Sequence, residues 1–213
     1  MKERLEIIFK VIPSVEVFAD IGCDHGLMTK KMLESGKCKR AIISDISKNC
    51  LAKAEKLLEK YIKNGTVNSF VSNGFDNLPA VDLALIAGMG GEEIISILER
   101  AKSLPNSLVL QPMKNPDKLR RKLLLLGYKF LRDFTFKAEN KFYDLMLIER
   151  GEDELSELEI LFGRDNLKEK GSAFIERVEI AINSNKDYLK RELSASAREK
   201  ILLETEQLEK CLN

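Results

Sequence analysis

Apolar residues along the first 126 positions follow two spacings, one typical of helices and the other of buried strands. The run at 81–87 is nearly all apolar, as expected of a central parallel strand that is covered on both faces. Strands and helices alternate, which predicts a parallel α/β sheet with helices on both faces. The predicted helices lie near residues 5–12, 27–33, 47–61 (with Ser47 as its N-cap), 92–101 and 117–126. The predicted strands lie near residues 17–22, 40–45, 69–71, 81–87 and 108–110.

The pattern changes after Gly127. Two successive strands near 128–136 and 142–149 predict an antiparallel edge of the sheet. From about residue 155 the spacing is helical only, with candidate breaks at 183–185 and 194–196, which predicts a helical hairpin or small coiled-coil bundle. We therefore expect an α/β, Rossmann-like domain over residues 1–152 and a helical extension over residues 153–213.

Charge separates the same two regions. The whole chain has a net charge of +1, but residues 1–150 hold 25 Lys and Arg against 19 Asp and Glu. Residues 151–213 hold 10 against 15. Opposite signs in the two regions support two structural units. Hydrophobic residues make up 44% of the chain, enough to fill a substantial core.

Several classes of protein are excluded by composition. No stretch approaches the 18 apolar residues that a membrane span needs, and the charged N-terminus lacks an apolar signal core. A cytoplasmic protein with no membrane association is expected. The four cysteines are scattered, and His25 is the single histidine, so neither a zinc signature nor a multi-histidine metal site is predicted.

The first strand runs into the most distinctive loop, Asp20–Gly26. Its two glycines are spaced G-x-x-x-G, whereas a nicotinamide-binding loop reads G-x-G-x-x-G. Asp20 and Asp24 would repel a pyrophosphate but would attract the ammonium and sulfonium groups of S-adenosylmethionine. The loop therefore favours S-adenosylmethionine over a dinucleotide.

Three further strand ends supply matching groups. Asp45 can accept hydrogen bonds from both ribose hydroxyls, Asn73 can bind the adenine amino group, and Phe75 can pack on the ring. Three glycines within residues 88–91 make room for a ligand at the fourth strand end. The predicted cofactor-binding residues are Asp20, Gly22, Cys23, Gly26, Asp45, Ile46, Asn73, Gly74, Phe75, Ala87, Gly88 and Met89.

Three segments together resemble the tRNA (adenine-22-N1)-methyltransferase family. They are DIGCDHG at Asp20–Gly26, IAGMGG at Ile86–Gly91 and LQP at Leu110–Pro112, in matching order and spacing. The resemblance covers essentially the whole chain, in outline only after residue 150. It implies a class I methyltransferase fold with sheet order 3-2-1-4-5-7-6. It further implies S-adenosylmethionine as the methyl donor and N1 of adenosine 22 in tRNA as the acceptor.

Methylation of adenine N1 also predicts which residues contact the adenosine that accepts the methyl group. Asp24 and His25 lie where a carboxylate would stabilise the positive charge that grows on a methylated adenine, so both are candidate catalytic residues. A cluster of nine Lys and Arg against three acids at 114–141, and a second at 30–40, could bind RNA phosphates or could simply be solvated helix faces. The predicted substrate-binding residues are Gly90, Gly91, Gln111, Pro112, Lys114, Asn115, Arg120 and Arg121.

Two other functions fit the same residues. One is a methyltransferase that acts on a small molecule or a protein, and the other is a non-catalytic S-adenosylmethionine-binding protein. The basic clusters favour an RNA substrate over a small molecule or a protein. The presence of Asp24 and His25 beside the cofactor loop favours a catalytic protein over one that only binds S-adenosylmethionine. The sequence is compatible with a monomer and with a weak dimer.

Overall fold

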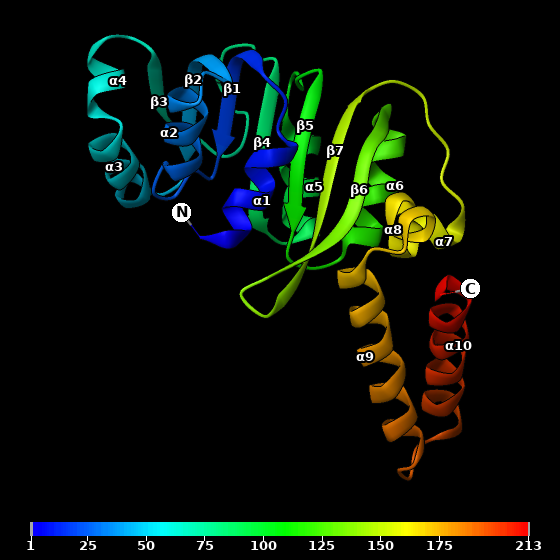
Figure 1. Cartoon of the computed structure of the whole chain (residues 1–213). Helices are drawn as coiled ribbons and strands as arrows, with labels where there is room; N and C mark the ends of the chain where they lie inside the picture. The colour runs from blue at the N-terminus through cyan, green and yellow to red at the C-terminus, as the bar shows by residue number, and fades with distance from the viewer. Residues whose placement is uncertain (1, 213) are drawn as a thin grey trace.

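A seven-stranded sheet forms the centre of the computed structural model, which describes residues 2–212 (Figure 1). Its strands are β1 (Val15–Ile21), β2 (Cys38–Asp45), β3 (Val67–Val71), β4 (Leu83–Met89), β5 (Ser107–Pro112), β6 (Tyr128–Ala138) and β7 (Lys141–Arg150). The strand order is β3-β2-β1-β4-β5-β7-β6, with β7 antiparallel to both of its neighbours. This order confirms the Rossmann-like fold that the sequence predicts.

Helices cover both faces of the sheet because its strands are apolar on both sides. In β1, Phe18 packs into one buried cluster with Ile8 and Met32, whereas the next residue, Ala19, packs into a second cluster with Ile94 and Leu123. Alternation of this kind follows from the two-residue period of a strand. The helices that cover the sheet are α1 (Glu3–Val11), α2 (Leu27–Glu34), α3 (Lys48–Leu57), α4 (Glu59–Lys63), α5 (Gly91–Arg100) and α6 (Pro116–Leu125).

Several predicted boundaries differ from the structure, among them those of the helix after β2 and of strands β4 and β5. The helix expected over 47–61 divides at Leu58 into α3 and α4, although Ser47 caps it as predicted, accepting a hydrogen bond from the Cys50 amide at 3.3 Å. Strand β4 extends through Gly88 to Met89, and β5 extends to Pro112. The extension arises because Met89 pairs with Pro112 across a bulge that follows Ala87, so these residues belong to the sheet rather than to loops.

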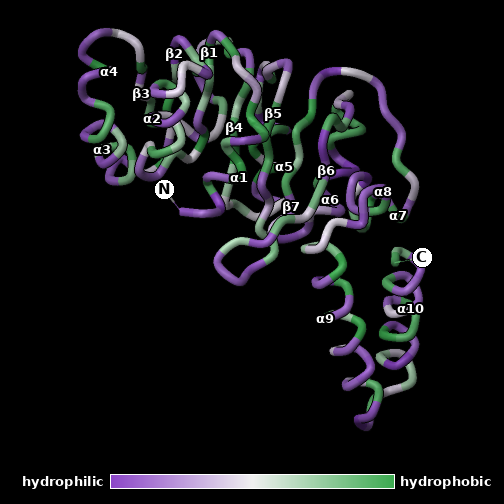
Figure 2. The backbone as a smooth tube through the Cα atoms, viewed as in Figure 1, coloured by the Kyte–Doolittle hydropathy of each residue, from purple (hydrophilic) through white to green (hydrophobic). Residues whose placement is uncertain are grey.

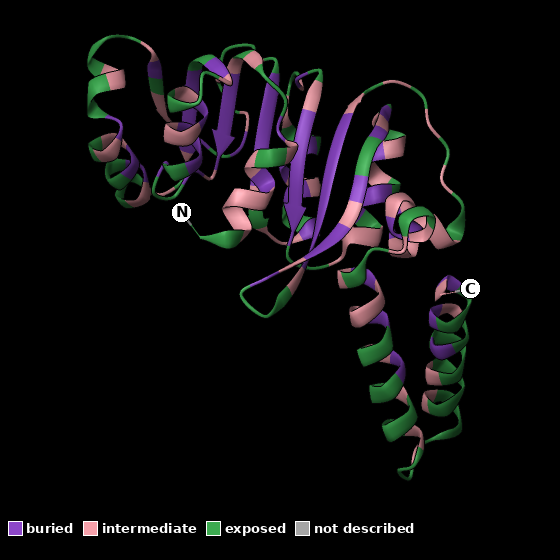
Figure 3. Ribbon diagram, in the orientation of Figure 1, coloured by how far each residue is buried: buried purple, intermediate pink, exposed green. Residues whose placement is uncertain are grey.

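The acidic tail, residues 151–213, forms helices and no strand within its described part, as predicted. Its first two helices pack on β6 and α6, and the last two form a hairpin that projects away from the sheet (Figure 1). Phe174, Val178 and Leu208 form a small buried cluster between the hairpin helices. Most other positions of these helices are exposed (Figure 3), and hydrophobic and hydrophilic residues are mixed along both of them (Figure 2). The tail helices are α7 (Glu157–Phe162), α8 (Arg164–Glu169), α9 (Ser172–Leu189) and α10 (Ala195–Leu212).

One of the two predicted helix breaks in the tail is present in the structure, and the other is not. Ser194 accepts a hydrogen bond from the Ala197 amide at 3.3 Å and so caps the start of α10. The break expected at 183–185 is wrong, because α9 continues through it and Asn185 donates to Thr205 across the hairpin at 3.2 Å. The division of the chain after residue 152 stays a prediction. None of the helices within residues 2–212 has the length and apolarity to cross a membrane.

Candidate functional site

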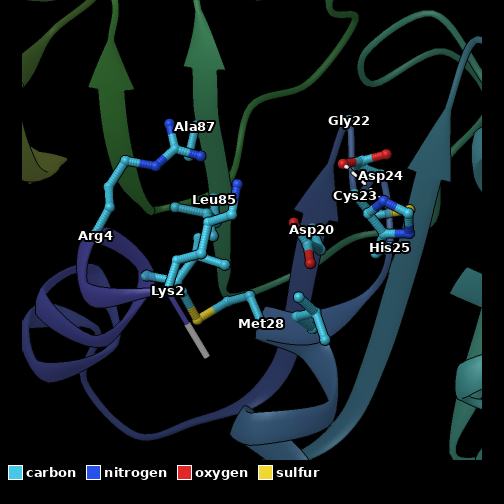
Figure 4. A pocket seen from close by; sticks show the side chains of 12 residues that line it. Lys2, Arg4, Asp20, Gly22, Cys23, Asp24, His25, Met28, Leu85 and Ala87 are labelled. Carbon is cyan, nitrogen blue, oxygen red and sulfur yellow. Dashed lines mark ion pairs between the residues drawn. The ribbon is translucent and has the colours of Figure 1, made fainter. Parts of the chain in front are cut away.

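Two adjoining cavities open where β1, β2, β3 and β4 end. The large lobe, of about 390 Å³, is lined by Gly22, Asp45, Asn73 and Gly88, among others. The small lobe, of about 150 Å³, contains Asp20 (Figure 4). The lobes share Arg4, Gly22, Asp24 and Ala87, so they form one continuous site. The glycines and carboxylates of four strand ends therefore converge, as the topology of an open parallel sheet requires.

The loop after β1 is held in a conformation that side chains rarely adopt. Gly22 and Gly26 have φ angles of 70° and 69°, and Asp24 between them has φ 45°. A Cβ on Gly26 would lie 3.0 Å from Ala54 in α3, so the loop packs directly on that helix. A non-glycine residue with positive φ costs free energy and is most frequent at functional sites. The loop therefore holds Asp24 in a strained backbone conformation where the two lobes meet.

Asp20 forms the buried wall of the small lobe. Its carboxyl is 5% exposed and accepts a hydrogen bond from the Thr29 hydroxyl at 2.9 Å. Burial raises its pKa to about 7, with a smaller contribution from the nearby Asp45 carboxylate. A buried carboxyl without a cationic partner among residues 2–212 suits a ligand that brings its own cation.

Asp20 should make stability depend on pH. Its carboxyl has a pKa of about 7 in the folded chain and an ordinary value of 3.8, so protonation favours folding. That contribution is fully present below pH 3.8 and is lost as the pH rises through about 7. We expect urea unfolding to show wild type losing stability relative to Asp20→Asn between pH 4 and pH 7, by at most about 1.4 kcal/mol per pH unit. Parallel pH profiles for the two proteins would contradict this assignment.

Asp45 is oriented by backbone amides at the end of β2. Its Oδ1 accepts from the Ser47 amide at 2.8 Å, and its Oδ2 accepts from the Asp24 amide at 3.4 Å. Asp24 itself is exposed, with its carboxylate 3.6 Å from His25 Nε2. Asp45 therefore faces the large lobe in a fixed direction, whereas Asp24 and His25 lie at the opening of the small lobe.

Most of the other predicted cofactor residues line the site. Ile46, Asn73, Gly74, Ala87, Gly88 and Met89 border the large lobe, and Cys23 borders the small lobe. Burial raises the pKa of the Cys23 thiol, so Cys23 stays protonated and acts as a small apolar wall. Two predicted residues lie outside the cavity lining. Gly26 packs the loop on α3, and the half-buried Phe75 packs against the core cluster that includes residues of α5.

The predicted substrate-binding residues that follow β4 or lie at the end of β5 are largely inside the protein. Gln111 is fully buried, where its Nε2 donates to the Pro112 carbonyl at 2.9 Å, and Pro112 is buried as well. A Cβ on Gly91 would lie 2.5 Å from the Asn115 carbonyl, so this glycine permits close packing of two loops. Gly90 and Asn115, the N-cap residues of α5 and α6, are half-buried and outside the cavity lining. Among these predicted residues, Lys114 is exposed.

The predicted role of Arg120 in binding RNA is wrong. Arg120 was expected on an RNA-binding surface, but its side chain is 0% exposed. Its guanidinium donates to both carboxylate oxygens of Asp133, with Nε to Oδ2 at 2.8 Å, and to the Ile160 carbonyl at 3.1 Å. A buried guanidinium with this set of partners cannot reach an RNA phosphate. Arg120 therefore joins α6 to β6 and α7.

Ion pairs neutralise most of the predicted basic surface. The acidic tail supplies several of the partners: Glu157 pairs with Arg121 at 2.5 Å, and Asp165 pairs with Arg132 at 2.7 Å. The opposite charges of the two regions thus attract each other across their contact. Seven further cations of the two basic clusters also pair with acids: Lys30, Lys31, Lys39, Lys118, Lys122, Lys129 and Lys137. Any RNA contact through these side chains must compete with an acid that is already in place.

Arg4 lines both lobes and is absent from the sequence-based prediction. It lies one helical turn before Ile8 and two before Ile12, both of which are fully buried. A charged residue on the core-facing stripe of an amphipathic helix is the signal that could have revealed it. Lys2, Glu93 and Met113 also border the site and were not predicted.

The fold and the site define a class of protein. A seven-stranded sheet in this order, with its cavity at the carboxyl ends of β1 to β4, is a Rossmann-like methyltransferase fold. The family model described as "Methyltransferase domain" matches residues 1–146. A putative tRNA methyltransferase of Mycoplasma genitalium is 31% identical over 156 residues, which cover 70% of each chain. The chain belongs to the methyltransferase-domain family, which confirms the predicted class.

Two further relatives match over most of their length. The tRNA (adenine(22)-N(1))-methyltransferase of Bacillus subtilis is 26% identical over 188 residues, which cover 83% of this chain and 79% of the relative. A Streptococcus pneumoniae putative tRNA (m1A22) methyltransferase, solved in complex with S-adenosyl-L-methionine, superposes with a TM-score of 0.90 at 24% identity and covers 100% of both chains. That superposition includes the helical hairpin, so the whole architecture is shared.

Proposed function

We propose that this protein transfers a methyl group from S-adenosylmethionine to N1 of adenosine 22 in tRNA. The observation that carries the proposal is the single cavity in which Gly22, Asp45 and Gly88 meet. The similarity to the Bacillus subtilis and Streptococcus pneumoniae proteins, which are named for this reaction, supports the same acceptor. A cytoplasmic location, where tRNA is modified, belongs to the proposal.

The residues present fit the cofactor. Asp45 presents a carboxylate whose direction is fixed by two amides, as needed to accept hydrogen bonds from ribose hydroxyls. Asn73 and Gly74 border the same lobe, which supports a contact between them and the adenine ring. Asp20 and Asp24 place acidic groups around the small lobe, which suits a ligand with cationic groups. S-adenosylmethionine, when bound, supplies the methyl group as an electrophilic sulfonium.

The protein has to orient the acceptor and stabilise charge. Ring N1 of adenine has an in-plane lone pair, so no strong base is needed to create the nucleophile. Positive charge develops on the adenine as the methyl group is transferred, and a carboxylate beside it lowers the barrier. Asp24 is exposed and borders both lobes, so it is the carboxylate that can meet an incoming base. The roles proposed here, orienting the acceptor and stabilising charge, are assigned to protein side chains and not to a metal ion.

Asp45→Ala should weaken cofactor binding. Removing the carboxylate deletes charge-assisted hydrogen bonds to the ribose, so we expect the Kd for S-adenosylhomocysteine to rise by about 10-fold or more. Isothermal titration calorimetry measures this directly. Asp82→Ala is a matched control, since Asp82 is an exposed carboxylate that binds the Val17 amide at 2.8 Å, away from the cavity. Equal affinities for wild type and Asp45→Ala would remove the ribose assignment.

The reaction itself is tested with tRNA. Protein, tRNA and donor carrying a labelled methyl group are incubated, and nucleosides are then separated by mass spectrometry. We expect labelled 1-methyladenosine, which should be lost when adenosine 22 is replaced by guanosine. Labelled 1-methyladenosine from the guanosine-22 tRNA would overturn the position, and label in a small molecule or a protein alone would overturn the acceptor. Donor binding without transfer would identify a non-catalytic binding protein.

A further inference from the structure

The half of the hairpin that lies farther from the sheet has no buried core. The buried residues of its two helices are Phe174, Val178, Ile182, Thr205, Leu208 and Cys211. From residue 183 to residue 204, no side chain is fully buried, and Figure 3 shows this end of the hairpin as mostly exposed. Helical segments shorter than about 12 residues are marginally stable on their own. A partner that covers residues 195–204 would therefore stabilise them.

An exposed groove runs along this part of α10. It has a volume of about 790 Å³, and Leu189, Leu202 and Leu203 are among the residues that line it. Leu202 and Leu203 are 51% and 58% exposed. Single exposed apolar side chains are normal at protein surfaces, but here adjoining leucines border a groove on a helix with no core beneath it. This α10 groove therefore suits an apolar partner surface.

Acids outnumber bases on the rim of the α10 groove. Glu199, Glu206 and Glu209 line it, together with the two cations Lys186 and Arg198. Lys186 already pairs with Glu209, with Nζ 3.3 Å from Oε1. An acidic rim with one cation already engaged repels the phosphates of a nucleic acid. The rim instead fits a protein surface that carries charges of both signs.

The charges of α10 are arranged so that two copies of the helix complement each other. Arg198 lies four positions before Leu202, and Glu206 lies four positions after it. Arg198 forms no ion pair with residues 2–212; its Nη2 donates to the Leu189 carbonyl at 3.1 Å. In a two-fold symmetric contact, each residue meets its counterpart reciprocally. Two antiparallel helices that cross at Leu202 therefore place each Arg198 opposite Glu206 of the partner subunit.

We propose that two copies of this protein associate through α10, antiparallel and centred on Leu202. The contact covers the exposed leucines and adds two ion pairs by symmetry. A helix of 18 residues is about 27 Å long, so one helix pair buries less than the roughly 1,200 Å² of a stable dimer. The dimer is therefore weak, with a Kd of about 10–100 µM. The residues that line the α10 groove line neither lobe of the cofactor site, so both sites stay open.

Sedimentation velocity of the full chain over about 10–500 µM tests the association. We expect the sedimentation coefficient of wild type to rise with concentration, and Leu202→Glu to raise the dimer Kd at least about 10-fold, because two like charges then meet at the symmetry axis. Ile180→Glu is a matched control, since Ile180 is 53% exposed on α9 and lies outside the groove. It should dimerise as wild type does. A constant sedimentation coefficient in wild type, or equal behaviour of Leu202→Glu, would overturn the inference.

A charge exchange tests the antiparallel arrangement. Arg198→Glu and Glu206→Arg each place like charges opposite one another, so each should raise the dimer Kd by about 3- to 10-fold. The double variant restores opposite charges and should return to within about twofold of the wild-type Kd. A merely structural effect of either residue would not be reversed in this way. A double variant as weak as the single variants would overturn the proposed pairing.

Hydrogen exchange locates the contact on the chain. Between about 10 and 500 µM wild type, amides of residues 199–204 should exchange several-fold more slowly, whereas those of the sheet should not change. Far-UV circular dichroism and the Kd for S-adenosylhomocysteine, unchanged within about twofold, would show that Leu202→Glu is folded. Protection confined to the sheet would overturn the inference. A monomeric wild type whose tRNA affinity falls in Leu202→Glu would assign the groove to RNA and would overturn it as well.

Discussion

Arg120→Ala should lower the free energy of unfolding by about 3–5 kcal/mol, the typical cost of removing one partner from a buried ion pair. The reason is the pair of carboxylates that it would leave behind. Asp133 is 1% exposed and receives two nitrogens of the guanidinium, and Asp144 lies 3.6 Å from Nη2. Without Arg120, Asp133 would be a buried anion with no cation beside it, and the Ile160 carbonyl would lose its donor. Urea unfolding monitored by circular dichroism measures the change.

The neighbouring Arg121 gives a matched control. Arg121 is half-exposed and pairs at 2.5 Å with Glu157, which is more exposed still. We expect Arg121→Ala to cost less than about 1 kcal/mol, since surface ion pairs contribute little. Equal effects of the two substitutions would show that the buried network does not stabilise the contact between the sheet and the tail helices.

Asp24→Asn should lower kcat by about 100-fold while changing the cofactor Kd by less than about threefold, because the carboxylate acts on charge that develops only during transfer. Asparagine is close in size and tolerates the left-handed backbone conformation that Asp24 adopts at φ 45°. The substitution therefore removes the charge and keeps the loop. Single-turnover transfer to tRNA gives the rate, and calorimetry with S-adenosylhomocysteine gives the affinity.

His25→Ala tests whether the neighbouring histidine shares this role. His25 is exposed at the opening of the small lobe, 3.6 Å from the Asp24 carboxylate, and unlike Asp24 it does not border the large lobe, so we expect a smaller loss of rate than in Asp24→Asn. Full activity of Asp24→Asn would show that its carboxylate is not part of the chemistry. A parallel fall in rate and affinity would make Asp24 a cofactor ligand instead.

Local pattern was sufficient for the sheet and for most of the cavity. Buried parallel strands need continuous apolar runs, and each run ends in residues that must face the ligand edge of an open sheet. Asp45 and Gly88 could therefore be placed on the same edge from their positions after two such runs. The Ser47 cap could also be predicted from sequence, because it depends only on residues within one helical turn.

Contacts between side chains that are far apart in the sequence could not be predicted from local pattern. Arg120 and Arg121 are adjacent in sequence and identical in type, yet one is buried against Asp133 and the other lies at the surface with Glu157. Which of them faces inward depends on the helix that packs over α6, and that helix comes from the tail. Gln111 and Arg4 illustrate the same limit, since they are 107 positions apart and bind each other at 2.9 Å.

The central claim is that one cavity at the ends of β1 to β4 holds the cofactor, and amide chemical shifts report this directly. Labelled protein is titrated with S-adenosylhomocysteine, and shifts are followed by heteronuclear NMR. We expect the largest changes at Gly22, Asp45, Asn73 and Gly88, and none along α10. Shifts confined to another surface, or no shifts with saturating ligand, would contradict the account.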